Sequence, residues 1–529
     1  MKAQGNRLVK RTLLGLVLAL FLIGAAMQAA RMMSDVKEEG QLNNCEGNIV
    51  WQASQIFPLR SAFRPIEHYP QVIFPYTPLY YVAVRVVSGV LKDPLLSGRM
   101  VSMAAALWIV GLFGLTVLKA TRGYAPAGIR CFASACTCAL ALQLPAMIWV
   151  PLARVDLLGI ALQFSALSVL CIRRFRFPNQ MAAFFLLLLG LYTKQSLLAI
   201  PAASVLLIGL IRPSRALQLA GGFAATGLAV FLAFAWVTDG GTVRHWIIYN
   251  VHPFNLLAAI RQEYLGSKGL VAVIAAGLAA FWLAIPPASR ARWRDRRALV
   301  SARLLHSRLR RVGLGFGLVA TLGFLWSLGS GKEGADINYF LDWQLALCPL
   351  TGVFLVLCLR EWEKQDHGMA ILRPLLVLLL GATALQLGVD SMYACNSAIG
   401  LGREARRERA AARREEAELV KLIATFPGPV ASENTVALVR AGKSIPFDPG
   451  LLKATAETGV FDENPLLKRV SDRFFDAFVL TDSASQFFSP RMLEAIHQNY
   501  QPYPFNGRHY LIYVRKGSAA ARDVSPVAD

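Results

Sequence analysis

The sequence has few acidic residues and lacks the motifs that accompany strong positive charge in nucleic-acid-binding proteins. It contains 55 Lys and Arg residues against 33 Asp and Glu residues, which gives a formal net charge of +22 over 529 residues. No zinc-binding pattern, helix-turn-helix or basic-aromatic pattern is present. Internal repeats and long low-complexity tracts are also missing. We therefore expect no nucleic-acid partner.

Long apolar runs are the main feature that the sequence does have. Hydrophobic residues make up 55% of the chain and the mean hydropathy is +0.45, which is too apolar for a soluble protein of this length. Such runs are typical of membrane-spanning helices. We interpret them as about eleven crossings, at Thr12–Ala30, 97–118, 128–149, 157–172, 181–192, 196–211, 217–237, 269–287, 312–328, 343–360 and 371–393.

The loops between these runs predict an orientation in the membrane. The N-terminus carries Lys2, Arg7, Lys10 and Arg11, which places it in the cytoplasm and makes the first run a retained span. Alternate loops from there are basic, as the positive-inside rule requires. Their basic residues are Lys119, Arg122, Arg130, Arg173, Arg174, Arg176, Arg212, Arg215, nine arginines within 288–311, and Arg360, Lys364 and Arg373. We therefore predict a multi-pass protein of the cytoplasmic (inner) membrane.

The chain divides into two predicted domains. Residues 1–399 form the membrane domain, with interfacial helices in the outer segments 31–96 and 239–268. Residues 400–529 form a charged helix and a small soluble α/β domain outside the membrane. Its expected elements are a helix over Arg403–Lys421, strands at Val436–Val439, Ala477–Leu480 and Tyr510–Val514, and a helix over Pro490–Gln498. The fold class is thus mainly α, a polytopic bundle with a small α/β tail.

Cysteine spacing predicts no metal motif. None of the eight cysteines is in a CxxC pair, and Cys136 and Cys138 are separated by one residue. Most cysteines lie in or beside apolar runs, where they are usually packing residues. Cys45 and Cys395 are both predicted to face outward, which leaves a disulfide between them open. We predict no metal ligands, and a requirement for a divalent metal is left open.

The polar residues between the spans gather on the predicted outer side, and polar groups near a bilayer usually mark a functional site. The first outer loop offers two candidate catalytic carboxylates, Asp35 and Glu46. Glu46 stands before an amphipathic stretch that would hold it close to the membrane surface. A carboxylate there can act as general base for an acceptor hydroxyl. The alternative is that these acids only solvate the loop.

Two further outer segments carry candidate cations. Arg154 and Asp156 lie between consecutive spans, where they form either a local ion pair or a phosphate-holding rim. Lys194 and Gln195 interrupt an apolar stretch of about 30 residues. A lysine in such surroundings requires a counter-charge, so we interpret Lys194 as a phosphate contact rather than a snorkelling residue.

The segment Gly334-Ala335-Asp336-Ile337-Asn338-Tyr339-Phe340 lies on the same predicted side. Asp336 and Asn338 offer carboxylate and amide groups for sugar hydroxyls, and Tyr339 offers an aromatic face. The alternative is a tight connection that Asp and Asn cap.

The order of these motifs resembles the GT-C superfamily of polytopic glycosyltransferases, in the branch of protein O-mannosyltransferases and bacterial aminoarabinose transferases. The matching motifs are the acidic motif after the first span, Tyr-Thr-Pro-Leu-Tyr-Tyr with Tyr76 and Tyr80, Gly98-Arg99, Ala-Arg-Val-Asp, Thr-Lys-Gln and Gly-Ala-Asp-Ile-Asn-Tyr-Phe-Leu. The resemblance covers roughly residues 10–395.

The resemblance implies an enzyme that moves a sugar from a polyprenyl-phosphate carrier to an acceptor at the outer membrane face. That acceptor would be an envelope glycan, lipid or protein, and no tightly bound cofactor is implied. The family's catalytic acid lies in the first outer loop, commonly in an Asp-Glu pair, and this chain has Cys45-Glu46 there. Glu46 is then the implied base, with Asp35 as substitute.

The other family positions carry over as substrate contacts. Lys194, Arg154 and Arg99 correspond to phosphate-binding cations, and Asp336, Asn338 and Tyr339 to the late outer loop near substrate.

Two other functions stay open on the sequence. A transporter or flippase of a lipid-linked or anionic solute would have charges near the middle of the membrane and matched halves; here the charges lie at span ends. A non-catalytic relative is the second alternative, because of Cys45.

Overall fold

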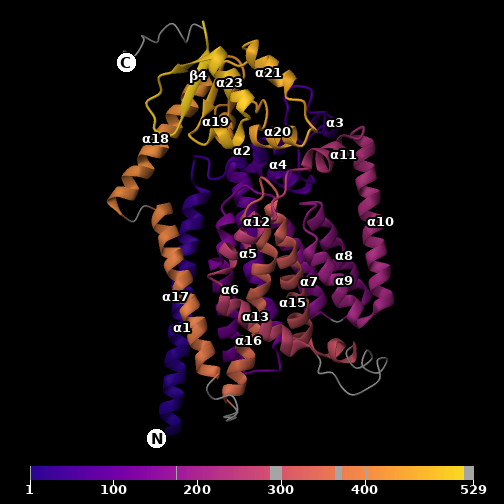
Figure 1. Cartoon of the computed structure of the whole chain (residues 1–529). Coiled ribbons are helices and arrows are strands. Elements are labelled where there is room, and N and C mark those ends of the chain that lie inside the picture. The colour runs from indigo at the N-terminus through magenta and orange to yellow at the C-terminus, as the bar shows by residue number, and fades with distance from the viewer. Residues whose placement is uncertain (1, 174, 286–300, 364–371, 400–401, 518–529) are drawn as a thin grey trace.

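The computed structural model describes residues 2–173, 175–285, 301–363, 372–399 and 402–517. A helical bundle forms the larger part, and a smaller domain lies over one of its ends (Figure 1). Most of the predicted arginine-rich loop 288–311 lies outside the described residues, as does Lys364.

Each of the eleven apolar runs contains one helix of the bundle. The helices are α1 (Lys2–Val36), α5 (Pro94–Ala120), α6 (Ala127–Gln143), α7 (Asp156–Ile172), α8 (Phe177–Leu191), α9 (Ala199–Ile211), α10 (Pro213–Val237), α13 (Val271–Ala284), α15 (Arg308–Ser327), α16 (Leu341–Glu363) and α17 (Leu372–Ile399). Among the described residues five helices are long and apolar enough to cross a membrane alone, or six if the bent pair of α12 and α13 counts as one span. The chain is a multi-pass membrane protein, and the number of eleven crossings stays a prediction.

Aromatic packing holds the centre of the bundle together. Phe113 of α5, Phe164 of α7 and Phe316 of α15 form a triangle with ring centroids 5.0–5.8 Å apart. All three side chains are fully buried. Fully burying one such side chain stabilises the fold by roughly 1.5–3 kcal/mol, so this triangle fixes how α5, α7 and α15 lie relative to one another.

Helices α7 and α8 approach each other closely through glycine. A Cβ on Gly190 would lie 2.4 Å from Gln163 Cγ and 2.9 Å from the Gly159 carbonyl oxygen, so only glycine fits there. α8 and α9 have 15 and 13 residues, about 20 Å each at 1.5 Å per residue. The close contact brings the end of α8, and the polar break before α9, beside the start of α7.

Short helices cover the end of the bundle that faces the C-terminal domain (Figure 1). They are α2 (Glu46–Gln55), α3 (Leu59–Ala62), α4 (Leu79–Leu91), α11 (Gly241–Trp246) and α12 (Leu256–Ser267). The segments predicted to hold interfacial helices, 31–96 and 239–268, thus contain short helices. α12 is bent by 91° from α13 and exposes Leu257, Ile260 and Tyr264, as expected of a helix along a membrane surface.

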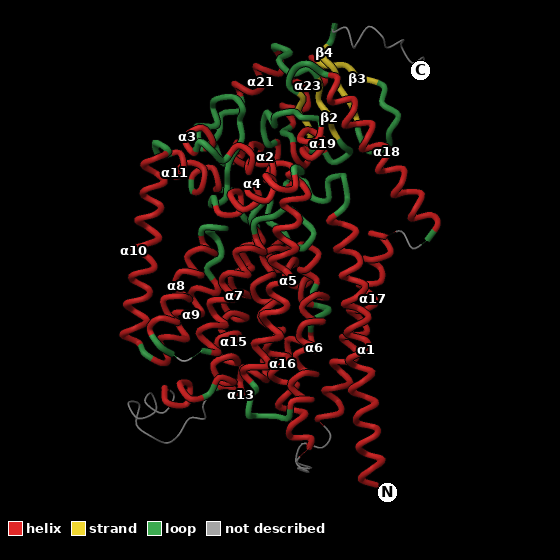
Figure 2. Tube along the Cα trace, turned by 180° about the vertical axis from the view of Figure 1, so that it is seen from behind, coloured by secondary structure: helices red, strands yellow, loops and turns green. Residues whose placement is uncertain are grey.

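The C-terminal domain begins with the predicted charged helix, α18 (Arg403–Thr425). A four-stranded sheet follows, in the order β1-β2-β4-β3, with β1 parallel to β2 and the other pairs antiparallel. The strands, which Figure 2 shows together in this domain, are β1 (Val430–Ser432), β2 (Ala477–Leu480), β3 (Tyr500–Tyr503) and β4 (Leu511–Arg515). Its further helices are α19 (Thr435–Arg440), α20 (Pro449–Glu457), α21 (Asn464–Ser471), α22 (Ala484–Phe487) and α23 (Pro490–Asn499).

Four of the five elements expected within this domain, the charged helix α18 among them, are confirmed, and one is wrong. Strands at Ala477–Leu480 and near Tyr510–Val514 form, and the helix from Pro490 forms. Val436–Val439 is helical in α19 because the Asn434 side chain accepts a hydrogen bond from Ala437 N and caps a helix.

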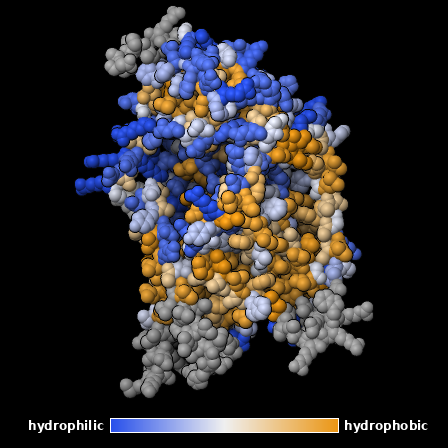
Figure 3. Space-filling model, viewed as in Figure 1, coloured by the Kyte–Doolittle hydropathy of each residue, from blue (hydrophilic) through white to orange (hydrophobic). Residues whose placement is uncertain are grey.

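The surface agrees with a membrane position for the bundle. Hydrophobic residues cover much of the bundle, and hydrophilic residues gather over the C-terminal domain (Figure 3). Cys45 and Cys395 are both free thiols, as are the other six cysteines, so the disulfide left open by the sequence does not form in this structure.

Candidate active site

Asp156 is the centre of a polar cluster built from three distant segments. It is the first residue of α7, where the helix dipole favours a carboxylate. Its Oδ1 accepts hydrogen bonds from Lys194 Nζ at 2.5 Å and Asn338 Nδ2 at 2.9 Å, and its Oδ2 accepts from Trp149 Nε1 at 2.8 Å. Trp149 ends the short helix η1 (Pro145–Trp149), Asn338 lies in the short helix η4 (Ile337–Phe340), and Lys194 lies in the turn after α8. The cluster therefore exists only when α7, α8, η1 and η4 are in place.

Aromatic rings surround the Lys194 ammonium. Nζ lies 5.3 Å from the ring centroid of Tyr339 and 5.8 Å from that of Tyr76, within cation–π range. Gln195 Nε2 donates to the Pro75 carbonyl oxygen at 2.6 Å and ties the same break to the loop that carries Tyr76. Five further residues that the sequence predicted for the site therefore lie around or beside Asp156. They are Tyr76, Lys194, Gln195, Asn338 and Tyr339.

Arg154 extends the cluster toward the first outer loop. Its Nη1 donates to Asn43 Oδ1 at 3.1 Å, and the guanidinium lies 4.9 Å from the Trp149 ring centroid. Nε is buried without a hydrogen-bond partner. Within the described ranges no carboxylate lies at ion-pair distance from Arg154, although the Cys45 thiol lies against it. Burial raises the pKa of Cys45, so this side chain is a neutral thiol at neutral pH.

Sequence reasoning missed Lys332, a second cation without an acidic partner in the part of the chain that the structure describes. Its Nζ donates to the backbone and side-chain oxygens of Asn250, at 2.5 and 2.9 Å. Burial and the nearby Lys194 charge lower the pKa of Lys332 to about 8, so it stays mostly protonated at neutral pH. Its place just before the Gly334 segment was the only signal available.

Several buried polar atoms near these residues have no partner in the protein. They are Asn48 Oδ1, Gln71 Oε1 and Nε2, Gln195 Oε1, Asn338 Oδ1 and Asp342 Oδ1. Most buried polar groups in proteins are hydrogen-bonded, because an unpaired group is costly. Asn338 and Gln195 belong to the Asp156 cluster and the loop beside it, and a ligand bound there would supply the partners that these two side chains lack. Asn48, Gln71 and Asp342 were not among the predicted site residues.

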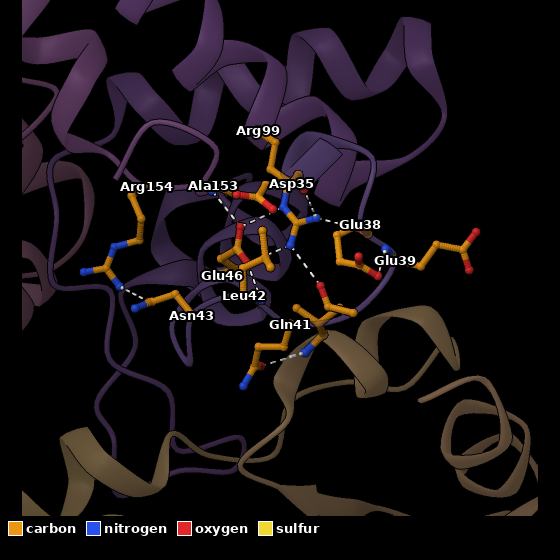
Figure 4. Close-up of polar contacts among 12 residues, drawn as sticks. Asp35, Glu38, Glu39, Gln41, Leu42, Asn43, Glu46, Arg99, Ala153 and Arg154 are labelled. Atoms are coloured by element: carbon orange, nitrogen blue, oxygen red, sulfur yellow. Dashed lines mark hydrogen bonds and ion pairs between the residues drawn. The ribbon is translucent and has the colours of Figure 1, made fainter. Parts of the chain in front are cut away.

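Glu46 belongs to a second, fully satisfied cluster (Figure 4). Its Oε1 accepts from Arg99 Nε at 2.9 Å and Ala153 N at 2.8 Å, and its Oε2 accepts from Arg99 Nη2 at 2.8 Å and Leu42 N at 3.0 Å. Both side chains are fully buried. Arg99 also donates to the carbonyl oxygens of Asp35, Glu38 and Gly40.

This geometry does not support the prediction that Glu46 is a general base. Four donors occupy its two oxygens, and two of them belong to a guanidinium, so accepting a proton would break a buried ion pair. Arg99 is occupied in the same way and has little capacity left for a phosphate. Asp35 is buried and paired with Arg31 at 3.3 Å and Arg409 at 3.8 Å. These three predicted residues organise the first outer loop in this structure.

Two other predicted residues lie away from the Asp156 cluster. Tyr80 is fully buried, and its hydroxyl donates to the Gly98 carbonyl oxygen at 2.9 Å, which fixes α4 on α5. Asp336 is exposed and accepts from Ile337 N at 2.7 Å, so it caps η4 as the alternative interpretation of this segment expected. Across the described ranges, no group of three or more His, Cys, Asp or Glu residues could hold a metal ion.

The bundle of apolar helices, the short helices over its end and the small C-terminal sheet together form a fold that is found in solved structures. Two of the structures that share it are of ArnT from Cupriavidus metallidurans. The apo form is 14% identical, with a TM-score of 0.56 over 93% of this chain and 97% of that chain. The form bound to undecaprenyl phosphate is 13% identical, with a TM-score of 0.56 over 94% and 98%. No protein-family model and no curated protein sequence matches the chain.

Proposed function

We propose that this protein transfers a sugar from a polyprenyl-phosphate carrier to an acceptor at the outer face of the cytoplasmic membrane. The observation that carries the proposal is the pair of cations Arg154 and Lys332, which have no acidic partner among the described residues and lie beside the Asp156–Lys194 pair. One of the ArnT structures of the same fold is bound to undecaprenyl phosphate, which is the class of ligand that such a site fits.

Charge at the site favours a phosphate. Arg154, Lys194 and Lys332 contribute three positive charges, and Asp156 is the one carboxylate that pairs with any of them at ion-pair distance in the described structure. An excess of buried positive charge is costly unless an anion neutralises it. A carrier phosphate would supply that anion, with Lys332 and Arg154 as its contacts and Asp156 holding Lys194 in position.

The same cations would assist the reaction. The acceptor hydroxyl oxygen forms a bond to the anomeric carbon, while the bond from that carbon to the phosphate oxygen breaks. The electron pair of the broken bond stays on the polyprenyl phosphate, whose growing negative charge the cations stabilise. The acceptor hydroxyl gives its proton to a carboxylate base. Tyr76 and Tyr339, whose rings face Lys194, offer apolar faces for the sugar ring.

Glu46, Arg99 and Asp35 would act as positioning residues. Through Ala153 N, Glu46 fixes the segment that leads into Arg154, and through Leu42 N it fixes the loop that carries Asn43, the partner of Arg154. The donor would be the sugar linked to polyprenyl phosphate. The acceptor would be an envelope glycan, lipid or protein.

Binding of undecaprenyl phosphate to the purified full chain in lipid nanodiscs tests this proposal. We expect Lys332→Ala and Arg154→Gln each to weaken binding by roughly 10- to 100-fold, because a hydrogen bond to a charged group contributes about 1.5–3 kcal/mol. Lys268→Ala is the matched control, since Lys268 is exposed on the same side at the end of α12. Wild-type affinity in both site variants, with the protein folded, would contradict the proposed phosphate site.

A further inference from the structure

The C-terminal domain reaches the candidate site through the segment between α19 and α20. Gln71 N in the outer layer donates to the Pro446 carbonyl oxygen at 2.8 Å, and Gln71 pairs with Phe447 in a parallel β-bridge. Ile445 and Phe447 are buried in hydrophobic clusters shared with the outer loops. The soluble domain is therefore anchored here, and the next residue along the chain is Asp448.

The Asp448 side chain is buried in this interface. Its Oδ2 accepts from Asn48 Nδ2 at 2.5 Å, and its Oδ1 accepts from Leu451 N at 3.2 Å and caps α20. Asn48 is one turn after Cys45, so the carboxylate faces the start of α2. The charge of Arg154 is within electrostatic reach of it. Asp448 thus faces the phosphate-side cluster from the opposite domain.

Asp448 differs from Glu46 and Asp156 in having neutral partners. Glu46 is held by the Arg99 guanidinium, and Asp156 by the Lys194 ammonium. The described structure has no cation at ion-pair distance from Asp448. Burial raises the pKa of Asp448 to about 6, although the N–H groups of the α20 turn and the Arg154 charge oppose this shift. A base with such a pKa is well matched to neutral pH.

Two further acids are less suited to act on an acceptor. Asp336 is exposed and caps η4. Asp342 packs against α15: a Cβ on Gly323 of that helix would lie 3.2 Å from the Cβ of Asp342. Beside Asp448, by contrast, Asn48 Oδ1 and both side-chain atoms of Gln71 are buried without partners, and these side chains are 4% and 0% exposed. Unpaired amides are suitable partners for hydroxyl groups.

We propose that Asp448, a residue of the soluble domain, is the catalytic base that takes the proton of the acceptor hydroxyl. This inference rests on the proposed function and names the acid that the first outer loop does not provide, since Cys45 is a thiol and Glu46 is occupied. The proton moves from the acceptor oxygen to Asp448 Oδ2 as that oxygen bonds to the anomeric carbon. Asn48 holds the carboxylate, and its free Oδ1 accepts from a second hydroxyl of the acceptor.

The test measures polyprenyl phosphate released from a panel of polyprenyl-phosphate monosaccharides, with host membrane extract as the source of acceptor. Asp448→Asn keeps the size, the helix cap and a hydrogen-bond acceptor for Asn48, but it cannot take a proton. We expect release to fall by about 100- to 10,000-fold, as for loss of a general base, while undecaprenyl phosphate binding stays within threefold of wild type. Asp93→Asn is the matched control, because Asp93 caps α5 in the same way.

Two measurements separate a base from a structural cap. Wild-type release should rise with pH through about 6, because the carboxylate must be ionised to accept a proton. The double variant Cys45→Asp, Asp448→Asn should release polyprenyl phosphate at least ten times faster than Asp448→Asn alone. The Cys45→Asp substitution places a new carboxylate at position 45, near Asn48 and Arg154. A wild-type rate that is flat from pH 5 to pH 8 overturns the inference even if Asp448→Asn does not fold.

The outcomes for the inference and for the proposed function are distinct. An active wild-type protein with an equally active Asp448→Asn variant removes Asp448 as the base and leaves the glycosyltransferase function standing. A wild-type protein that neither binds undecaprenyl phosphate nor releases it from any donor removes both.

Discussion

Buried charged residues in this protein differ in how completely the protein itself satisfies them. Glu46 and Arg99 are fully paired, with every donor and acceptor directed at another protein atom. Arg154 and Lys332 have neutral partners only. A saturated buried pair maintains structure, whereas an unsaturated cation is available to a ligand. On this difference in partners we interpret Glu46 and Arg99 as positioning residues and propose Arg154 and Lys332 as ligand contacts.

Replacing Glu46 by Gln tests the positioning role. We expect Glu46→Gln to lower the free energy of unfolding by about 3–5 kcal/mol, because it leaves the Arg99 charge buried without a partner. Thermal unfolding in detergent measures the change, and Glu39→Gln, at an exposed acid of the same loop, should have no effect. A Glu46→Gln protein of wild-type stability that has lost sugar transfer would instead favour Glu46 as the base.

Single residues show where the sequence was sufficient. That Asp156, Lys194 and Asn338 lie together could be expected, because each is a polar residue at the same predicted end of an apolar run; their contact with a substrate stays a prediction. The pairing of Glu46 with Arg99 could not be, because it depends on how α2 packs on α5. Asp448 lies in a soluble domain of ordinary composition, and only the docking of that domain brings it to the membrane site.

At the scale of elements, apolar length and periodicity predicted the bundle helices well. The runs are long, and a long apolar run has one stable solution in a membrane. The secondary structure of the C-terminal domain was harder to predict. Val436–Val439 has the composition of a strand, yet Asn434 caps a helix there, and Val430–Ser432 and Tyr500–Tyr503 were missed because strands of three or four residues carry little pattern.

Contact between α2 and α19 depends on one glycine. A Cβ on Gly47 would lie 2.3 Å from the Thr435 carbonyl carbon and 2.4 Å from Val436 N. Backbone atoms cannot move aside easily, so we expect Gly47→Ala to destabilise the domain contact by about 1–3 kcal/mol or more. Limited proteolysis between the domains should become faster. Gly89→Ala in α4 meets nothing within 4 Å and should leave the cleavage rate unchanged; equal rates in the two variants would contradict this account of the contact.

At the scale of the whole molecule, the C-terminal domain is held over the site by charge as well as by apolar packing. Glu38 of the first outer loop bonds to Arg409 and Arg413 of α18. Burial alone would raise the pKa of Glu38, but these two arginines lower it to about 2. The bonds from Glu38 to Arg409 and Arg413 are therefore intact throughout the physiological pH range, so the domain that carries Asp448 stays docked.

Stability of the outer layer should depend on pH through His245. Its Nδ1 accepts from Phe74 N at 2.9 Å, and its Nε2 pairs with the Arg64 carbonyl oxygen at 2.7 Å. Burial lowers the pKa of His245 to about 4. A folded-state pKa below the unfolded value near 6.5 means that stability is complete above pH 6.5 and is lost as the pH falls toward 4.

Because of His245, the free energy of unfolding at pH 5 should be about 2 kcal/mol lower than at pH 7. Thermal unfolding of the full chain between pH 7 and pH 5 measures it. His245→Gln should flatten this pH dependence, and His68→Gln, at an exposed histidine, should retain it. A wild-type unfolding temperature that does not change between pH 7 and pH 5 would contradict the lowered pKa of His245 in the folded protein.

The first and last helices of the membrane domain lie side by side, α1 along α17 (Figures 1 and 2). Since α17 begins at Leu372, a ribosome must deliver more than two thirds of the chain before α1 meets this neighbour. Until then, α1 can pack on α6, whose Gln143 donates to the Phe21 carbonyl oxygen, while the face that α17 covers has no partner from this chain. We therefore expect the membrane domain to complete its packing late in synthesis. Truncated chains that end before α17 should be recognised as unassembled and degraded.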